Sequence, residues 1–162
     1  MAKKKEEKTN VMRTLEQRKI AYLAHTYPHE DGIAVDGVTV AQMLGQNPDA
    51  VFKTLVTKGA SGGYYVFDIP VAETLDLKKA AKAVGEKSIA MLPSKELLAL
   101  TGYVHGGCSP VGMKKQFPTV FHETCLEQDT IMVSAGKIGF QVEVRPGDLI
   151  ALVGAKTADV VV

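Results

Sequence analysis

Residues 51–70, VFKTLVTKGASGGYYVFDIP, predict a β-hairpin around which the rest of the fold is built. Two runs rich in β-branched and aromatic residues flank a connector of small residues, ASGG at 60–63, which is the pattern of two antiparallel strands and their turn. Large apolar side chains occur at both odd and even positions of the first run. We therefore expect a strand that is covered on both faces.

The remaining chain mixes helix and strand patterns without a strict alternation. A first helix is predicted to begin at a cap on Asn10 and to run to about residue 19. A second begins at a capping box formed by Thr39 and Gln42 and stops at Gly45, and three more are predicted over 76–85, 94–100 and 146–154. Strands are predicted over 22–27, 119–123, 130–136, 139–145 and 159–162. Because tight turns join most neighbouring strands, the expected fold class is α+β, with a mixed, largely antiparallel, barrel-like sheet and helices packed outside.

Length and composition limit the classes of protein that fit. A chain of 162 residues without a Pro- or Ser-rich linker suits a single domain, which we place at 9–162 after a disordered tail at 1–8. The sequence has no apolar run of membrane-spanning length and no secretory signal, and its two cysteines form no CxxC, so a cytoplasmic location is expected. A net charge of +1 argues against a stand-alone binder of duplex nucleic acid.

A lysine interrupts the first apolar run of the hairpin. Lys53 lies near the middle of the strand, where an unpaired ammonium is costly to bury. Its stem can extend along apolar neighbours to water, or its amine can pair with a carboxylate such as Asp68 on the adjoining strand. Alternatively, the strand borders a cleft in which the amine has a chemical role.

The segment GGCSPVGMKK at 106–115 predicts a tight loop. Free N–H groups in such a loop can bind a phosphate or a developing oxyanion, although a purely structural loop fits equally well. Gly107 and Gly112 have the spacing of a nucleotide-binding loop, but Met113 stands where that motif requires lysine, so nucleotide hydrolysis is excluded.

Other reactive side chains give weaker signals. Cys108 could act as a nucleophile with His105 or His122 as its base, but an incidental small residue is the favoured interpretation. A metal site built from the four histidines, which also include His25 and His29, is weaker still. The segment SAGKIG at 134–139 reads as a hairpin turn that could also place Ser134 in a site.

Four segments together resemble a known family. HTYPH at 25–29, FKTL at 52–55, GYVHGGCSPVGMKK at 102–115 and VSAGKIG at 133–139 follow one another as in the YbaK/EbsC group of trans-editing deacylases. The resemblance runs from about Thr9 to Val162. It is strongest to the YbaK-type Cys-tRNA(Pro) deacylases, which are related to the prolyl-tRNA synthetase editing domain.

The resemblance implies a YbaK-like fold and an aminoacyl-tRNA deacylase without a metal or other cofactor. Its substrate would be the acceptor end of mischarged Cys-tRNA(Pro), and possible further substrates include Cys-tRNA(Cys). It would act beside prolyl-tRNA synthetase and use the thiol of the substrate as the attacking group. The implied catalytic residues are Lys53, Gly106, Gly107 and Pro110, and the implied substrate-binding residues are Tyr27, Thr54, Cys108, Ser109, Ser134 and Gly136. Two alternatives stay open, namely a deacylase for another amino acid such as alanine and a non-catalytic module that binds an acceptor end.

Overall fold

A computed structural model describes residues 8–162 of the chain. Residues 1–7 of the predicted tail therefore lie outside the described residues. The helices are α1 (Asn10–Gln17), α2 (Gly37–Leu44), α3 (Leu77–Val84), α4 (Ser94–Thr101) and α5 (Pro146–Val153), and η1 (Pro48–Ala50) and η2 (Glu123–Glu127) are short 3-10 helices. The strands are β1 (Tyr22–Thr26), β2 (Phe52–Gly59), β3 (Tyr64–Pro70), β4 (Ile89–Met91), β5 (Thr119–His122), β6 (Ile131–Ser134), β7 (Phe140–Val144) and β8 (Lys156–Ala158).

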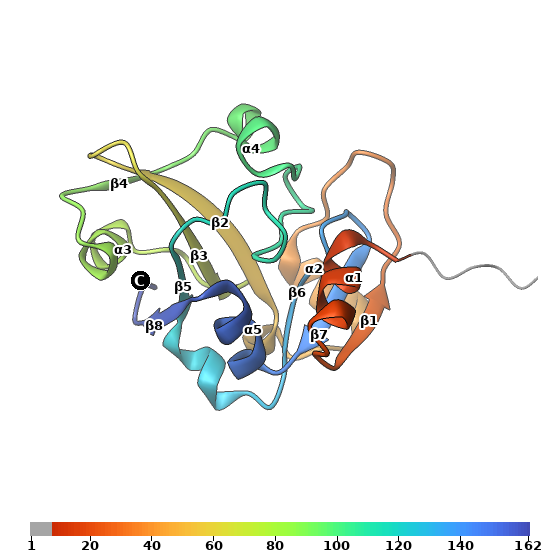
Figure 1. Cartoon of the computed structure of the whole chain (residues 1–162). Coiled ribbons are helices and arrows are strands. Elements are labelled where there is room, and N and C mark those ends of the chain that lie inside the picture. The colour runs from red at the N-terminus through yellow and green to blue at the C-terminus, as the bar shows by residue number, and fades with distance from the viewer. Residues whose placement is uncertain (1–7) are drawn as a thin grey trace, which may run out of the picture.

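The predicted hairpin is the centre of a five-stranded sheet. Its strands β2 and β3 pair antiparallel, and the strand order of this sheet is β4-β2-β3-β5-β8. A three-stranded sheet of order β1-β7-β6 lies beside it (Figure 1). Within residues 8–162, β5 runs parallel to β3 and β8, and the other strand pairs are antiparallel. The mixed, largely antiparallel α+β fold is confirmed.

The two sheets do not close into a barrel. In the described part of the chain they are joined where β2 meets β6, through an isolated parallel bridge between Val51 and Met132. The sheets are therefore two separate surfaces that meet at one corner of β2.

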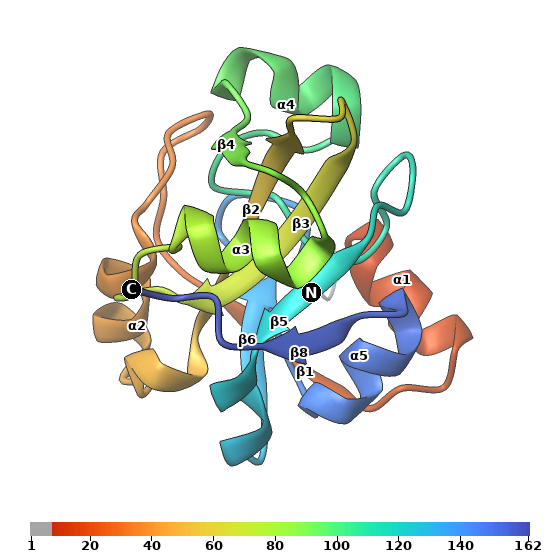
Figure 2. The same ribbon diagram turned by 90° about the vertical axis from the view of Figure 1, so that its left-hand side faces the viewer.

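Helix α3 lies across the outer face of the five-stranded sheet (Figure 2). Phe67 and Leu55, which point to this face, pack in one apolar cluster with Ala80 of α3. Phe52 points to the opposite face and belongs to a second cluster, with Phe121 of β5. β2 is thus covered on both faces, as its sequence predicts.

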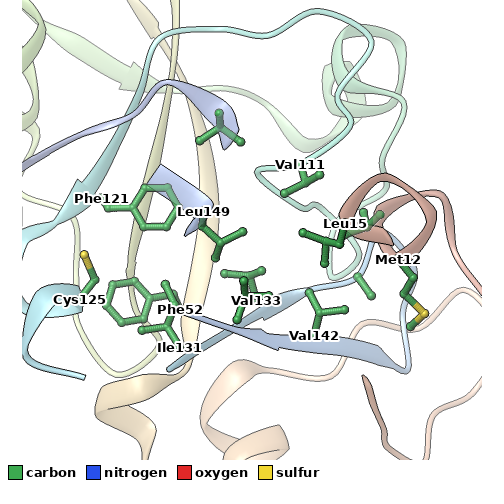
Figure 3. Close-up of a cluster of buried hydrophobic side chains, with 14 residues drawn as sticks. Met12, Leu15, Phe52, Val111, Phe121, Cys125, Ile131, Val133, Val142 and Leu149 are labelled. Carbon is green, nitrogen blue, oxygen red and sulfur yellow. The ribbon is translucent and has the colours of Figure 1, made fainter. Parts of the chain in front are cut away.

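The second cluster joins the first and last helices, α1 and α5, to the two sheets. Figure 3 shows Leu15 of α1 and Leu149 of α5 directed toward Val133 and Val142 of the three-stranded sheet. Val111 enters the same cluster from the loop that follows α4, and its side chain is 1% exposed. The glycine-rich loop is therefore anchored in the core at its centre.

Two predicted helix starts are wrong by one to three residues. Thr9 caps α1, since its extended backbone lets the side chain accept a hydrogen bond from the Met12 amide, and Asn10 is the first helical residue. Asp36 caps α2 by accepting from the Thr39 amide, which places Thr39 inside the helix. The predicted stop at Gly45 is confirmed, with the glycine in the left-handed conformation.

The short edge strands were not predicted. β4 and β8 have three residues each, too few to display an alternation of apolar and polar side chains. The strand predicted at 159–162 is wrong, because Val161 makes only an isolated bridge to Leu75.

Candidate active site

The candidate site lies along an open part of the edge of β2. On the side away from β3, β2 makes a bridge to β6 at Val51 and pairs with β4 only from Thr57 to Gly59. No strand within residues 8–162 covers the stretch between these two pairings. A cavity of about 460 Å³ occupies this gap, which is a size typical of small-molecule sites.

Consecutive residues of β2 line the cavity because it borders the strand's edge. Phe52, Lys53, Thr54 and Leu55 all contribute to its wall, although their side chains alternate between the two faces of the sheet. A cavity above one face would be lined by every second residue only. The edge position therefore lets a side chain from each face reach one ligand.

Lys53 is half-buried and makes one hydrogen bond within residues 8–162. Its Nζ donates to the carbonyl oxygen of Val71, at 3.2 Å. Burial lowers the pKa of Lys53, while the charge of Glu73 acts in the opposite direction. The amine therefore stays beside the cavity with a single main-chain acceptor.

The alternative in which Lys53 pairs with Asp68 is wrong. Asp68 is opposite Thr54 in the register of the hairpin, so its side chain projects from the other face of the sheet. Its Oδ1 accepts a hydrogen bond of 2.6 Å from the Thr54 hydroxyl. Burial raises the pKa of Asp68 to about 7, and its Oδ2 has no hydrogen-bond partner among the described residues.

The two adjacent glycines of the loop are held closely by neighbouring segments. Gly106 has φ of +87°, and a Cβ there would lie 2.5 Å from the Cβ of Ala34. A Cβ on Gly107 would lie 3.1 Å from the main-chain nitrogen of Ile138. The Gly107 amide already donates to the carbonyl of Val104, so this N–H is not free to hold an anion.

Two further residues of the loop face the interior. Ser109 is fully buried, and its Oγ accepts a hydrogen bond from the Val111 amide in a local turn. Pro110 is buried beside it. Neither residue lines the cavity, so their position indicates that they shape the loop.

The β6–β7 turn contributes Ser134 to the cavity. The Ser134 hydroxyl accepts from the amide of Gly136, whose φ is +92°. A Cβ on Gly136 would lie 2.9 Å from the ring of Tyr103, so the glycine allows the turn to approach the loop. Tyr103 in turn donates to the carbonyl of Val111 within the loop, so the ring that contacts the turn is held by the loop itself.

The structure brings most of the predicted site residues to one cavity. Those lining it are Tyr27, Lys53, Thr54, Gly106, Cys108 and Ser134. Those that do not line it are Gly107, Ser109, Pro110 and Gly136.

Three further polar residues, Asp36, Asp68 and Gln141, were not predicted as site residues, and Asp36 lines the cavity while it caps α2. Gln141 lines the cavity and is 4% exposed; its side-chain oxygen accepts from Gln46 Nε2 and its side-chain nitrogen donates to Gln46 Oε1. Asp68 is buried behind Thr54. Gln141 and Asp68 are polar residues inside apolar strands, and that local signal could have found them.

Cys108 has the wrong chemistry for a nucleophile. Burial, with the charge of Asp68 adding to it, raises the pKa of the Cys108 thiol to about 12. The attacking species is the thiolate, which is negligible at neutral pH for such a thiol. His122 does not serve as its base, because its Nδ1 accepts from the Val160 amide in the core.

A metal site is not assembled by the residues that the structure describes. Among residues 8–162, no three His, Cys, Asp or Glu side chains are grouped as metal ligands would be. His25, one of the candidates, makes a hydrogen bond of 2.8 Å with Glu143 through its Nε2 instead. In the same residues, no helix combines the length and apolar character needed to traverse a membrane.

Comparisons with known proteins agree with this geometry. Residues 34–152 match the family model of the aminoacyl-tRNA editing domain. The chain is 46% identical over 162 residues to the Enterococcus faecalis protein named "Putative Cys-tRNA(Pro)/Cys-tRNA(Cys) deacylase EbsC", and the match covers 99% of this chain and 98% of that protein.

Solved structures show the same architecture. A protein described as "a putative trans-editing enzyme for prolyl tRNA synthetase" superposes with a TM-score of 0.80 at 28% identity, over 94% of both chains. A protein described only as hypothetical superposes with a TM-score of 0.83 at 24% identity, over 94% of this chain and 99% of the other, and so supports the fold alone. The family match, the full-length relative and the cavity at the β2 edge together show that the chain belongs to the aminoacyl-tRNA editing domain family.

Proposed function

We propose that the chain is a trans-editing deacylase that releases cysteine from mischarged Cys-tRNA(Pro), and also from Cys-tRNA(Cys). The observation that carries this substrate choice is the 46% identity to EbsC over nearly the whole of both chains. We assign the activity to a single editing domain at 9–162, acting in the cytoplasm beside prolyl-tRNA synthetase. An editing step is physically reasonable, since a pocket that accepts proline discriminates poorly against a side chain of similar size.

The thiol of the substrate supplies the nucleophile in this proposal. Its sulfur forms a bond to the ester carbonyl carbon, the bond from that carbon to the terminal ribose oxygen breaks, and the ribose oxygen leaves with a proton. The resulting cysteine thiolactone is then hydrolysed by water. This sequence fits a cavity in which the protein's own thiol, Cys108, has its pKa raised to about 12.

The protein's side chains hold and orient the ester. The Lys53 ammonium binds the terminal phosphate or a ribose hydroxyl, supported by its position at the cavity with a single main-chain acceptor. Gly106 admits the acceptor end close to the main chain, and Tyr27 and Ser134 line the pocket for the aminoacyl group. Gly107, Ser109, Pro110 and Gly136 act by shaping the loop and the adjoining turn.

Deacylation assays on charged tRNA test the proposal. The purified protein is incubated with Cys-tRNA(Pro), Ala-tRNA(Pro) and Pro-tRNA(Pro), and the loss of each ester is measured against spontaneous hydrolysis. We expect rapid loss of the cysteinyl ester only. Loss of the alanyl ester with an intact cysteinyl ester would overturn the substrate choice, and binding without cleavage of any ester would indicate a non-catalytic module.

A further inference from the structure

Thr54 occupies the open part of the β2 edge, and its main chain faces the cavity side. Hydrogen bonds between β2 and β3 involve the odd-numbered residues of β2, as shown by the bonds from Val71 N to Val51 O and from Gly59 N to Gly63 O. The even-numbered residues point the other way, and Val56 O accepts from Leu92 N on that side. By this alternation the N–H and C=O of Thr54 point away from β3, into the uncovered gap.

The side chain of Thr54 is held by a buried carboxylate. Thr54 and Asp68 form a pair whose main chains do not exchange hydrogen bonds, which is the arrangement that brings facing side chains closest. The Thr54 hydroxyl donates its only hydrogen to Asp68 Oδ1, at 2.6 Å. Lone pairs of the Thr54 oxygen therefore remain for a hydrogen-bond donor in the cavity.

Asp68 has no cation of its own in the described residues. It is 0% exposed, and its Oδ2 has no partner there. The titratable groups near it are the thiols of Cys108 from the glycine-rich loop and Cys125 from η2. Both thiols have pKa values raised by burial, to about 12 and about 11, so neither changes charge near neutral pH.

We propose that Thr54 is the receptor for the α-ammonium group of the aminoacyl ester, and that Asp68 is the positioning residue that keeps the Thr54 hydroxyl turned as an acceptor. The ammonium donates to the Thr54 hydroxyl oxygen and to the Thr54 carbonyl oxygen, and the buried charge of Asp68 complements it through the hydroxyl. The inference rests on the proposed function, because it assigns a part of the same substrate.

The arrangement separates two positive charges. Lys53 and Thr54 project from opposite faces of β2 but line the same cavity. Lys53 can therefore hold an anionic or hydroxyl group of the terminal nucleotide while Thr54 holds the cationic end of the amino acid. The ester between them lies across the strand edge.

The binding of an ammonium is linked to the charge of Asp68. A protonated Asp68 can donate to the Thr54 oxygen, which turns the hydroxyl proton toward the cavity and opposes a cationic ligand. Because the pKa of Asp68 is raised to about 7, Asp68 becomes charged as pH rises through neutrality, and the Thr54 hydroxyl then donates to Asp68 and can accept from the ligand. A nearby ammonium should in turn lower the pKa of Asp68.

The test compares two esters that differ only in the amino group. Cysteinyl-tRNA(Pro) and 3-mercaptopropionyl-tRNA(Pro) carry the same thiol and the same ester, and only the first has an α-ammonium. We expect the parent protein to favour the cysteinyl ester in kcat/KM by about 10- to 100-fold. Asp68→Asn should reduce this preference to within about 3-fold.

The pH profile separates positioning from a structural role. The preference of the parent should rise from about pH 5 to about pH 6.5, where Asp68 begins to gain its charge while the α-amino group of the ester stays protonated, and that of Asp68→Asn should not rise over the same range. Thr57→Val is the matched control, since Thr57 is a fully buried threonine of the same strand that bonds Tyr65 O at 2.9 Å and does not line the cavity. Its preference should equal that of the parent.

A measurement on the parent protein covers the case in which a variant fails to fold. Carbon-13 NMR of the Asp68 carboxyl is followed against pH, with 3′-cysteinylamido-3′-deoxyadenosine or its desamino analogue present. Only the analogue with the amine should lower the pKa of Asp68.

The outcomes distinguish the two claims. Equal kcat/KM for both esters, an unchanged preference in Asp68→Asn, or equal effects of the two analogues on Asp68 would overturn the inference and leave the deacylase function standing. If the parent releases no cysteine from tRNA above the spontaneous rate, the proposed function fails and the inference falls with it.

Discussion

Replacement of Lys53 by methionine should separate activity from stability. The variant keeps a stem of similar length and removes the ammonium, which donates a hydrogen bond to Val71 O at 3.2 Å. Burial lowers the pKa of Lys53 in the folded protein, so the charged form is less favourable there than in the unfolded chain. We therefore expect the free energy of unfolding of Lys53→Met to equal that of the parent or exceed it, within about 1 kcal/mol.

The deacylation rate of Lys53→Met should fall strongly although its stability does not. If the ammonium fixes the terminal nucleotide and the ester, its loss removes about 3–4 kcal/mol of transition-state stabilisation, which is a 10²- to 10³-fold fall in the rate of Cys-tRNA(Pro) deacylation. Single-turnover deacylation and denaturant unfolding measure the two effects on the same preparation. Lys58→Met is the control, because Lys58 is an exposed residue of the same strand, placed over the ring of Tyr64.

The difference in stability between Lys53→Met and the parent should change with pH in a direction that can be checked. Since the folded-state pKa of Lys53 is lowered, its charge costs stability at neutral pH, and this cost shrinks once pH exceeds the folded-state pKa and disappears above the pKa of the unfolded chain. Any stability advantage of Lys53→Met should therefore shrink at alkaline pH. A rate within about 3-fold of the parent would refute the catalytic role of the amine, and an activity loss explained by unfolding would refute the separation of the two effects.

Four further substitutions, one of them a control, test the packing and chemistry of the site. Gly106→Ala should lower the free energy of unfolding by about 2–5 kcal/mol, because it combines a left-handed φ with a Cβ 2.5 Å from that of Ala34. Gly102→Ala, at φ +86° with a flexible side-chain atom at 3.3 Å, should cost only about 1–2 kcal/mol in the same denaturant titration, and equal losses would contradict the close packing. Asp68→Asn should be more stable than the parent by up to ~4 kcal/mol at pH 8, since the raised folded-state pKa of about 7 makes the parent lose stability as pH rises from about 4 through 7. Thermal unfolding at pH 4 and pH 8 checks this, and a pH-independent difference would argue against titration of Asp68. Cys108→Ala should retain deacylation within about 3-fold in single-turnover assays, because the thiol is protonated at neutral pH, and abolished activity in a folded variant would show that the protein supplies its own nucleophile.

Local sequence signals predicted much of the fold. The small residues at 60–63 and the flanking β-branched and aromatic runs predict the β2–β3 hairpin, and the structure confirms it. Asp76 and Gly85 mark the ends of α3, since the carboxylate accepts from two amides of the first turn and the glycine adopts the left-handed conformation at the other end. These features depend on residues within a few positions of one another.

The site was predicted only in part, because some of its features depend on contacts between segments that are distant in sequence. Lys53 attracts attention within its own strand, because a charge in an apolar run is locally improbable. The Gly107 amide is different, since its bond to Val104 depends on how the loop turns. The burial of Ser109 and Pro110 likewise depends on which side of the loop meets the core.

The order of residues along the chain determined the hairpin, both ends of α3 and the unusual amine in the strand, because each follows from side-chain alternation or from hydrogen bonds between near neighbours. Tertiary structure alone decided that β6 and β4 leave a gap along β2, that the cavity fills this gap, and that Asp68 lies buried behind Thr54. These features arise between segments far apart in sequence, where packing rather than local preference selects the partner.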